Sequence, residues 1–95
     1  MRVLLLCDGN VCRSPLAAEY LRVRAAHARL SHLVVTSAGL LGLEGLAAAR
    51  EAVEAACEHG IDLSAHRSRG IRASDVAGAD VILGMTLRHL EEVEH

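Results

Sequence analysis

The feature that most constrains the fold is an apolar run near the start of the chain, followed at once by a polar loop and a helix start. Residues 2–6 include four consecutive apolar side chains, without the alternation of a half-exposed strand. Such a run is typical of a strand buried on both faces of a sheet. Residues 7–13 are mostly polar, and Ser14-Pro15 supplies a favoured N-cap and a favoured first helical residue. The sequence therefore predicts a buried strand, a loop and a helix from residue 15 to about residue 29.

The rest of the chain continues this alternation of strands and helices. Further strands are predicted at residues 33–37 and 81–83, further helices at residues 49–57 and 87–94, and a capped helical turn at Ser74-Asp75. Gly60 is expected at the C′ position of the second helix. This order implies parallel pairing, and we expect one α/β domain over residues 1–95, a three-layer sandwich with a short parallel sheet. A site is expected beyond the carboxyl ends of the strands, where Cys7, Ser37 and Met85 emerge.

Composition excludes several classes of function. Ten arginines, no lysine and 12 acidic residues give a formal net charge of -2. The chain therefore lacks the excess positive charge that is typical of proteins binding nucleic acid or acidic membranes. Tyr20 is the only aromatic residue besides histidine, so stacking on bases is nearly unavailable. No stretch approaches the ~20 apolar residues of a membrane helix, and three cysteines form no disulfide framework. We expect a cytoplasmic protein with reduced thiols and with neither nucleic-acid nor membrane partners.

The loop after the first strand places a cysteine and an arginine around a tight turn. Gly9 and Asn10 tolerate positive φ, which lets the loop N–H groups point inward as an anion-binding nest. The helix N-terminus adds partial positive charge, and Arg13 can grip an oxyanion through two parallel hydrogen bonds. This cradle suits a phosphate, and with the Ser14 hydroxyl it favours ionised sulfur at Cys7. Cys7 is expected to attack phosphorus in line and form a phosphocysteine.

Residues 7–15, CDGNVCRSP, resemble the phosphate loop of the low-molecular-weight protein tyrosine phosphatases. Residues 36–39, 60–68 and 79–86 resemble later segments of that family, in the same order. The resemblance covers nearly the whole chain and implies Cys7 as nucleophile and Arg13 as the clamp on the phosphate and the transition state. It implies a substrate-binding loop made of Asp8, Gly9, Asn10, Val11, Cys12, Arg13 and Ser14. We expect the Asp8 side chain to point outward.

The resemblance also implies a supporting hydrogen-bond network of Asn10, Ser14, Ser37 and His66 that holds the loop in shape. It implies that Cys12 forms a reversible disulfide with Cys7 and protects it from over-oxidation. Simpler interpretations stay open for four of these residues. Asn10 can be an ordinary turn residue, Ser37 a strand-end polar group, Cys12 a buried small hydrophobic residue and His66 a solvent-facing loop histidine. No cofactor is implied.

Two further groups of side chains are expected to serve packing. Cys57 falls on the apolar face of the second helix, and the leucines at positions 40, 41 and 43 form a short apolar cluster. A metal site is not expected, because the cysteine and histidine spacings match no common zinc pattern.

One departure from the family concerns the general acid. The family uses an aspartate of an Asp-Pro pair after a fourth strand, whereas the only proline here is Pro15 and the chain ends at His95. We therefore expect a C-terminally incomplete domain, whose third strand is an exposed sheet edge with a tendency to self-associate. Losing leaving-group protonation is typically worth 10²–10⁴ in rate.

Three functions from different classes follow. The first is a cysteine-dependent phosphatase acting on a phosphorylated protein or a small aryl phosphate. Val11 favours phosphotyrosine, because the phosphoarginine branch of the family carries threonine there, although residues 37–40 and 80–86 resemble that branch equally. The second is a phosphate-binding module with little turnover. The third is an arsenate reductase, which needs further cysteines late in the chain, and residues 58–95 contain none.

Overall fold

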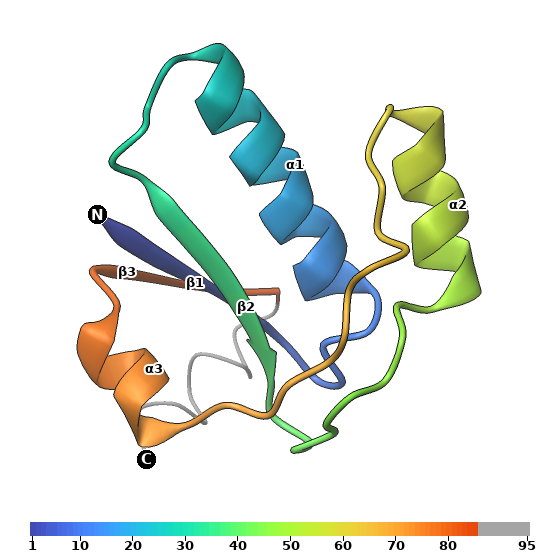
Figure 1. Cartoon of the computed structure of the whole chain (residues 1–95). Helices are drawn as coiled ribbons and strands as arrows, with labels where there is room; N and C mark the ends of the chain where they lie inside the picture. The colour runs from blue at the N-terminus through green and yellow to red at the C-terminus, as the bar shows by residue number, and fades with distance from the viewer. Residues whose placement is uncertain (86–95) are drawn as a thin grey trace.

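The computed structural model describes residues 1–85, which form a three-stranded parallel sheet with helices on both faces (Figure 1). Strand β1 (Arg2–Cys7) lies at the centre, between β2 (Val34–Gly39) and β3 (Val81–Gly84). Cys7 pairs with Gly39, and Leu6 pairs with Gly84, so the carboxyl ends of all three strands meet at one edge. The predicted α/β class, parallel pairing and central position of the first strand are confirmed.

Helix α1 (Arg13–His27) covers one face of the sheet, and α3 (Ala73–Gly78) lies at the other. Leu5 packs on the α1 side with Ala18, while Leu4 and Leu6 pack on the opposite side with Ala79. This alternation along β1 explains why residues 3–6 are all apolar: both faces of the strand are covered there. The predicted three-layer arrangement is therefore confirmed.

Helix α2 (Arg50–Glu58) packs against α1 rather than against the sheet, through a separate small core. Its buried stripe consists of Ala52 and Ala56, which meet Ile61 and Leu63 from the following loop. Gly60 has φ +72° just beyond the helix C-cap, as predicted for a C′ glycine. Small side chains at i and i+4 let the two helices approach closely in a core that contains no aromatic side chain.

The starts of two helices differ from their predicted caps. Helix α1 begins at Arg13 with Cys12 as N-cap, so Ser14 and Pro15 lie within its first turn. Ser14 does not cap the helix because its hydroxyl is engaged by Asn10 and by the sulfur of Cys7. Helix α3 has Arg72 as N-cap, and Asp75 accepts a hydrogen bond from the Arg72 backbone N–H at 2.8 Å. The helix predicted at residues 87–94 lies outside the described residues.

The outer edge of β2 is closed by arginine side chains. Arg22 donates to the carbonyl oxygen of Val35 through Nε at 3.1 Å and Nη2 at 2.8 Å. Arg69 donates to the carbonyl oxygen of Ser37 at 2.8 Å. Capped carbonyls do not accept another strand, so this edge is protected against pairing. Within residues 1–85, no helix is long and apolar enough to cross a membrane.

Candidate phosphate-binding site

The loop between β1 and α1 folds around the sulfur of Cys7. Cys7 ends the central strand and is 3% exposed. Asn10 directs its backbone N–H at the Cys7 Sγ, with 3.3 Å between nitrogen and sulfur. Asn10 adopts φ +57°, the left-handed conformation that asparagine accepts more readily than most residues, whereas Gly9 does not need positive φ. Of the two residues predicted to tolerate positive φ, only Asn10 adopts it.

A second donor reaches the sulfur from Ser14, whose Oγ lies 3.0 Å from the Cys7 Sγ. The Asn10 side-chain Nδ2 donates to Ser14 Oγ at 2.8 Å and to Ser37 Oγ at 2.9 Å. The Asn10 Oδ1 accepts from the backbone N–H of Arg69 at 3.0 Å, which fixes the orientation of the amide. While Cys7 is a thiol, either group can donate in this pair, but an ionised sulfur only accepts, so Ser14 then donates to it. This donation stabilises a thiolate.

His66 supports the same loop from the segment before α3. Its Nε2 lies 2.7 Å from the carbonyl oxygen of Asn10. A carbonyl oxygen only accepts, so the hydrogen is on Nε2. The structure therefore brings Asn10, Ser14, Ser37 and His66 into one connected set of hydrogen bonds, in which Asn10 contacts each of the others. Asn10 and Ser14 are both fully buried.

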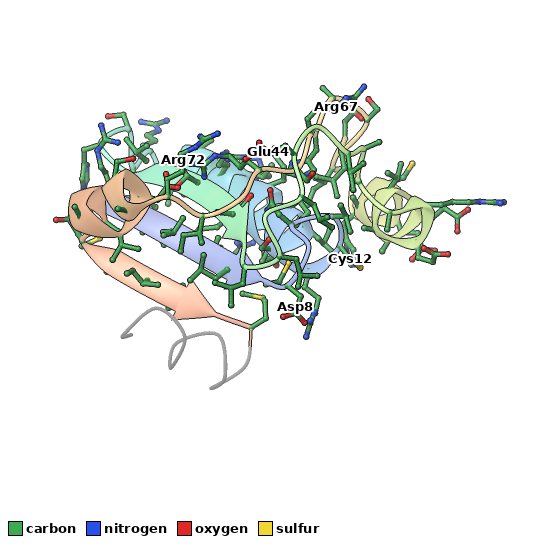
Figure 2. All side chains as sticks on the ribbon, turned by 90° about the horizontal axis from the view of Figure 1, so that it is seen from below. Asp8, Cys12, Glu44, Arg67 and Arg72 are labelled. Atoms are coloured by element: carbon green, nitrogen blue, oxygen red, sulfur yellow. The ribbon has the colours of Figure 1, made fainter. Side chains whose placement is uncertain are left out.

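Arg13 lies at the first position of α1, at the mouth of the loop. Its Nη2 is 3.5 Å from Asp8 Oδ2, and the two side chains are 51% and 34% exposed. Asp8 lies at the rim of the loop, as expected (Figure 2). An exposed ion pair of this length is weak, so an anion entering the loop can compete with Asp8 for the guanidinium.

The cysteines are all free thiols in the described structure, and they differ in exposure. Cys7 is buried, while Cys12, at the N-cap of α1, is exposed (Figure 2). The disulfide between them stays a prediction. Cys57 is also exposed, so its predicted place in the core is wrong. It follows Ala56 directly, and adjacent helical residues point about 100° apart, so only Ala56 joins the buried stripe of α2.

Two residues that sequence reasoning missed hold the loop from outside. Gly39 ends β2 so close to the loop that a Cβ on it would lie 2.8 Å from the carbonyl oxygen of Asp8 and 2.9 Å from the backbone nitrogen of Asn10. Arg69 supplies the backbone N–H that binds Asn10 Oδ1, and its carbonyl oxygen accepts from the backbone N–H of Gly39 at 2.8 Å. The segment after β2 adds a bond from the Leu41 N–H to the Asp8 carbonyl oxygen at 2.8 Å.

The leucines beside the loop are largely exposed rather than packed. Leu41 is 65% exposed and Leu43 38%, so the expectation that they serve packing is wrong for both. Leu43 Cδ1 and Val11 Cγ2 each lie 3.5 Å from the position of a Cβ on Gly9. Apolar surface thus borders the phosphate loop. Within residues 1–85, no cluster of three His, Cys, Asp or Glu side chains is placed to hold a metal ion.

Comparison with known proteins gives one consistent result. Residues 2–95 match the model of a family described as low molecular weight phosphotyrosine protein phosphatase. The chain is 40% identical over 92 residues to a Ralstonia nicotianae protein named probable low molecular weight protein-tyrosine-phosphatase EpsP, covering 97% of this chain and 60% of the relative. It is 36% identical over 92 residues to the protein-arginine-phosphatase of Geobacillus stearothermophilus, covering 97% and 59%.

Solved structures agree with these relatives. The chain superposes on a low molecular weight protein tyrosine phosphatase from T. tengcongensis with a TM-score of 0.90 at 40% identity, covering 99% of this chain and 64% of the other. It superposes on a mutant of YwlE from Bacillus subtilis with a TM-score of 0.92 at 32% identity, covering 98% and 62%. The chain thus spans about three fifths of the length of the curated relatives that it matches.

Proposed function

Because the chain belongs to the low molecular weight phosphotyrosine protein phosphatase family, we propose that it hydrolyses phosphoric monoesters through a phosphocysteine on Cys7. The observation that carries the proposal is the pair of contacts at the sulfur: the Asn10 backbone N–H donates to Cys7 Sγ, and the Ser14 hydroxyl, bound by Asn10 Nδ2, lies 3.0 Å from the same sulfur and can donate to it when it is ionised. Donors directed at a sulfur beside a helix N-terminus stabilise its thiolate, which is the form that attacks phosphorus.

The geometry supports the following chemistry. The Cys7 thiolate attacks phosphorus, the bond from phosphorus to the ester oxygen breaks, and the leaving oxygen takes up a proton from solvent water. Water then attacks the phosphocysteine, which releases inorganic phosphate and restores the thiolate. During both steps the Arg13 guanidinium leaves the Asp8 carboxylate and donates to two phosphoryl oxygens. The loop N–H groups donate to the negative charge that develops on the phosphoryl group.

A second candidate function is phosphate binding with little turnover. These 95 residues contain no Asp-Pro pair to act as general acid. An ester whose leaving group needs little protonation is hydrolysed without a general acid. Hydrolysis of an unactivated ester is slower by about 10²–10⁴ when the acid is absent.

We expect the 95-residue protein to hydrolyse p-nitrophenyl phosphate and to hydrolyse phenyl phosphate more slowly by about that factor. Steady-state rates on both esters, with the Cys57→Ser protein as matched control, measure this difference. Hydrolysis of neither ester, with inorganic phosphate still bound, favours the binding module. Equal rates on both contradict the absence of an acid within these residues.

For the substrate, we propose phosphotyrosine in preference to phosphoarginine. Val11 presents an aliphatic side chain in the loop, and the exposed Leu41 and Leu43 offer apolar surface beside it for an aromatic ring. One relative carries a tyrosine-phosphatase name and another an arginine-phosphatase name, so family membership alone does not decide between the two.

The Val11→Thr protein is expected to shift preference toward phosphoarginine by roughly tenfold, since one polar contact is worth about 1.4 kcal/mol. Competition between a phosphotyrosyl and a phosphoarginyl peptide measures the ratio of kcat/KM, with Leu46→Ala, at an exposed position between β2 and α2, as an apolar control. Efficient turnover of phosphoarginine by the parent protein, unchanged by Val11→Thr, overturns the preference.

We further propose that the protein self-associates through β3. Among the described residues β3 pairs only with β1, and Leu83 is 43% exposed. The neighbouring Met85 borders an apolar groove of about 500 Å³ that also includes Tyr20, itself 51% exposed. The β2 edge, in contrast, is closed by Arg22 and Arg69.

A Leu83→Lys substitution is expected to oppose edge pairing through charge. Light scattering after size exclusion should show the parent mass rising with concentration and the variant staying monomeric. A parent protein that is monomeric at every concentration, with a high melting temperature, refutes this proposal.

A further inference from the structure

We propose that Arg69 is a positioning residue for the nucleophile and that Asp75 of α3 holds it in place. The inference deepens the proposed function, because it assigns the residues that aim the donors at Cys7. No other residue among those described contacts Asn10, Ser37, Gly39 and Asp75 at once.

The Arg69 backbone contributes to this positioning through two hydrogen bonds. Its N–H binds Asn10 Oδ1 at 3.0 Å, and its carbonyl oxygen accepts from Gly39 at 2.8 Å. The amide of Asn10 is therefore held with Nδ2 toward Ser14 and Ser37. If the Arg69 N–H moves away, Oδ1 loses its partner, and a buried unsatisfied oxygen favours rotation of the whole amide.

The Arg69 side chain contributes as well, because it anchors that backbone. Nη1 donates to the carbonyl oxygen of Ser37 at 2.8 Å, and Nη2 donates to Asp75 Oδ1. The side chains of Arg69 and Asp75 are 30% and 15% exposed, so this ion pair is shielded more than the surface pairs of the molecule. The guanidinium therefore connects β2 to α3 through Ser37 and Asp75.

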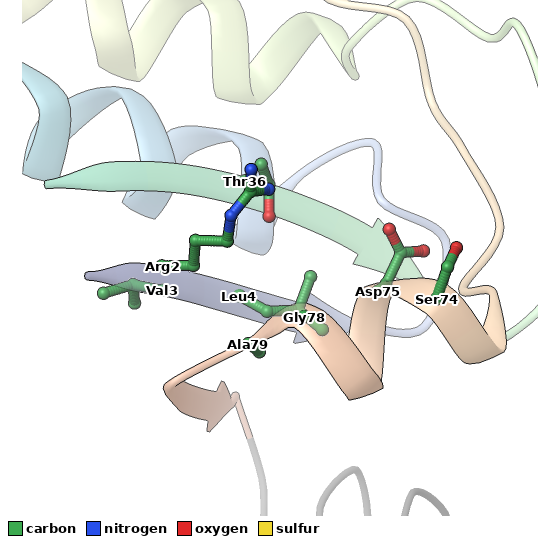
Figure 3. Close-up of a pocket in the computed structure, with 8 residues that line it drawn as sticks. All are labelled: Arg2, Val3, Leu4, Thr36, Ser74, Asp75, Gly78 and Ala79. Atoms are coloured by element: carbon green, nitrogen blue, oxygen red, sulfur yellow. The ribbon is translucent and has the colours of Figure 1, made fainter.

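Asp75 is itself fixed within α3. Its Oδ2 accepts from the backbone N–H of Arg72 at 2.8 Å, and Figure 3 shows it on α3 beside Ser74, lining a cavity of about 70 Å³ that borders β1 and β2. Burial raises the pKa of Asp75, but the hydrogen bonds from Arg69 and Arg72 outweigh it and hold the pKa below its usual range. The carboxylate therefore stays ionised above the ordinary carboxyl pKa of ~3.9, and the stability it contributes is lost only as pH falls through the lower folded-state value.

A continuous set of contacts thus joins α3 to the sulfur: Asp75, Arg69, Asn10, Ser14 and Cys7. The first three bonds of this set each have a defined donor and acceptor, and in the last one Ser14 donates when the sulfur is ionised. Removing the Arg69 side chain leaves the last three residues in place but frees the backbone that orients them. The effect is therefore expected on the nucleophile and on phosphate affinity, beyond any effect on folding.

The test uses Arg69→Ala, Arg69→Lys and Asp75→Asn, with Arg50→Ala as a matched control because Arg50 pairs only with Glu54 on the exposed face of α2. The readout is iodoacetamide alkylation of Cys7 against pH, with and without inorganic phosphate. Trypsin releases residues 3–13 as one peptide carrying both Cys7 and Cys12, and fragment-ion masses separate the two. Thermal unfolding of each variant is recorded in parallel.

We expect Arg69→Ala to raise the pH midpoint of Cys7 alkylation by about one unit and to weaken phosphate protection about tenfold. Arg69→Lys and Asp75→Asn should give smaller shifts, because each keeps part of the contact. Arg50→Ala should match the parent. A folded Arg69→Ala protein whose Cys7 profile and phosphate protection match the parent overturns the inference, whatever its melting temperature. Because alkylation needs no turnover, failure of the proposed hydrolysis appears separately, as phosphate protection without ester cleavage.

Discussion

Replacing Cys7 with serine is expected to abolish ester hydrolysis, by at least ~10³-fold, while inorganic phosphate still binds the loop. A serine hydroxyl in this site has the donors that stabilise an anion but lacks the acidity of a thiol, so it attacks phosphorus far more slowly. In the proposed site, phosphate is bound by loop N–H groups and Arg13, which the substitution leaves in place. Steady-state kinetics on p-nitrophenyl phosphate and calorimetric titration with inorganic phosphate measure the two effects.

Cys57→Ser provides the control, since Cys57 is exposed on α2 and contacts no residue of the loop network. Its rate and affinity should equal those of the parent. Residual hydrolysis by Cys7→Ser within tenfold of the parent would mean that another group attacks phosphorus, and the assignment of the nucleophile would be wrong.

The second large effect is expected at Gly39. A methyl group there would meet backbone atoms of Asp8, Gly9 and Asn10 at 2.8–2.9 Å, closer than a Cβ is ever found. Backbone cannot rotate away as a side chain can, so Gly39→Ala must push the loop off β2. We expect a loss of about 1–3 kcal/mol in the free energy of unfolding and at least tenfold weaker phosphate binding.

Gly78→Ala is the matched control, because a Cβ at Gly78 meets nothing within 4 Å and Gly78 does not adopt positive φ. This change should be neutral or should stabilise by up to about 1 kcal/mol, through the unfolded chain. Urea unfolding and phosphate titration of both variants separate the two positions. A Gly39→Ala protein with unchanged stability and phosphate affinity contradicts the close packing of β2 against the loop.

The sequence alone was sufficient to predict the elements that have strong local patterns. The apolar run of β1 and the following loop and helix are such elements, and so is Gly60 at the end of α2. Local patterns failed where tertiary contacts compete for the same atoms. Ser14 suits an N-cap by type, but its oxygen is bound by Asn10, and Cys12 takes the cap position instead.

The residues that hold the loop from outside were beyond prediction for a different reason. Gly39 is required because two segments distant in sequence approach within contact distance, and no local pattern records that approach. Arg69 binds Asn10 through its backbone N–H, a group that every residue except proline carries. The residue type at position 69 therefore does not indicate this contact in the sequence. The ion pair between Arg69 and Asp75 is recognisable only in the folded structure.

The central claim is that the loop of residues 7–13 binds a tetrahedral oxyanion directly against the sulfur of Cys7. The most direct measurement is a crystal structure of the protein with orthovanadate. We expect vanadium bonded to Cys7 Sγ, the Asn10 N–H still directed at that sulfur, and the Arg13 guanidinium moved from Asp8 onto two vanadate oxygens. Vanadate absent from the loop at saturating concentration, or bound there with Arg13 still paired to Asp8, would contradict it.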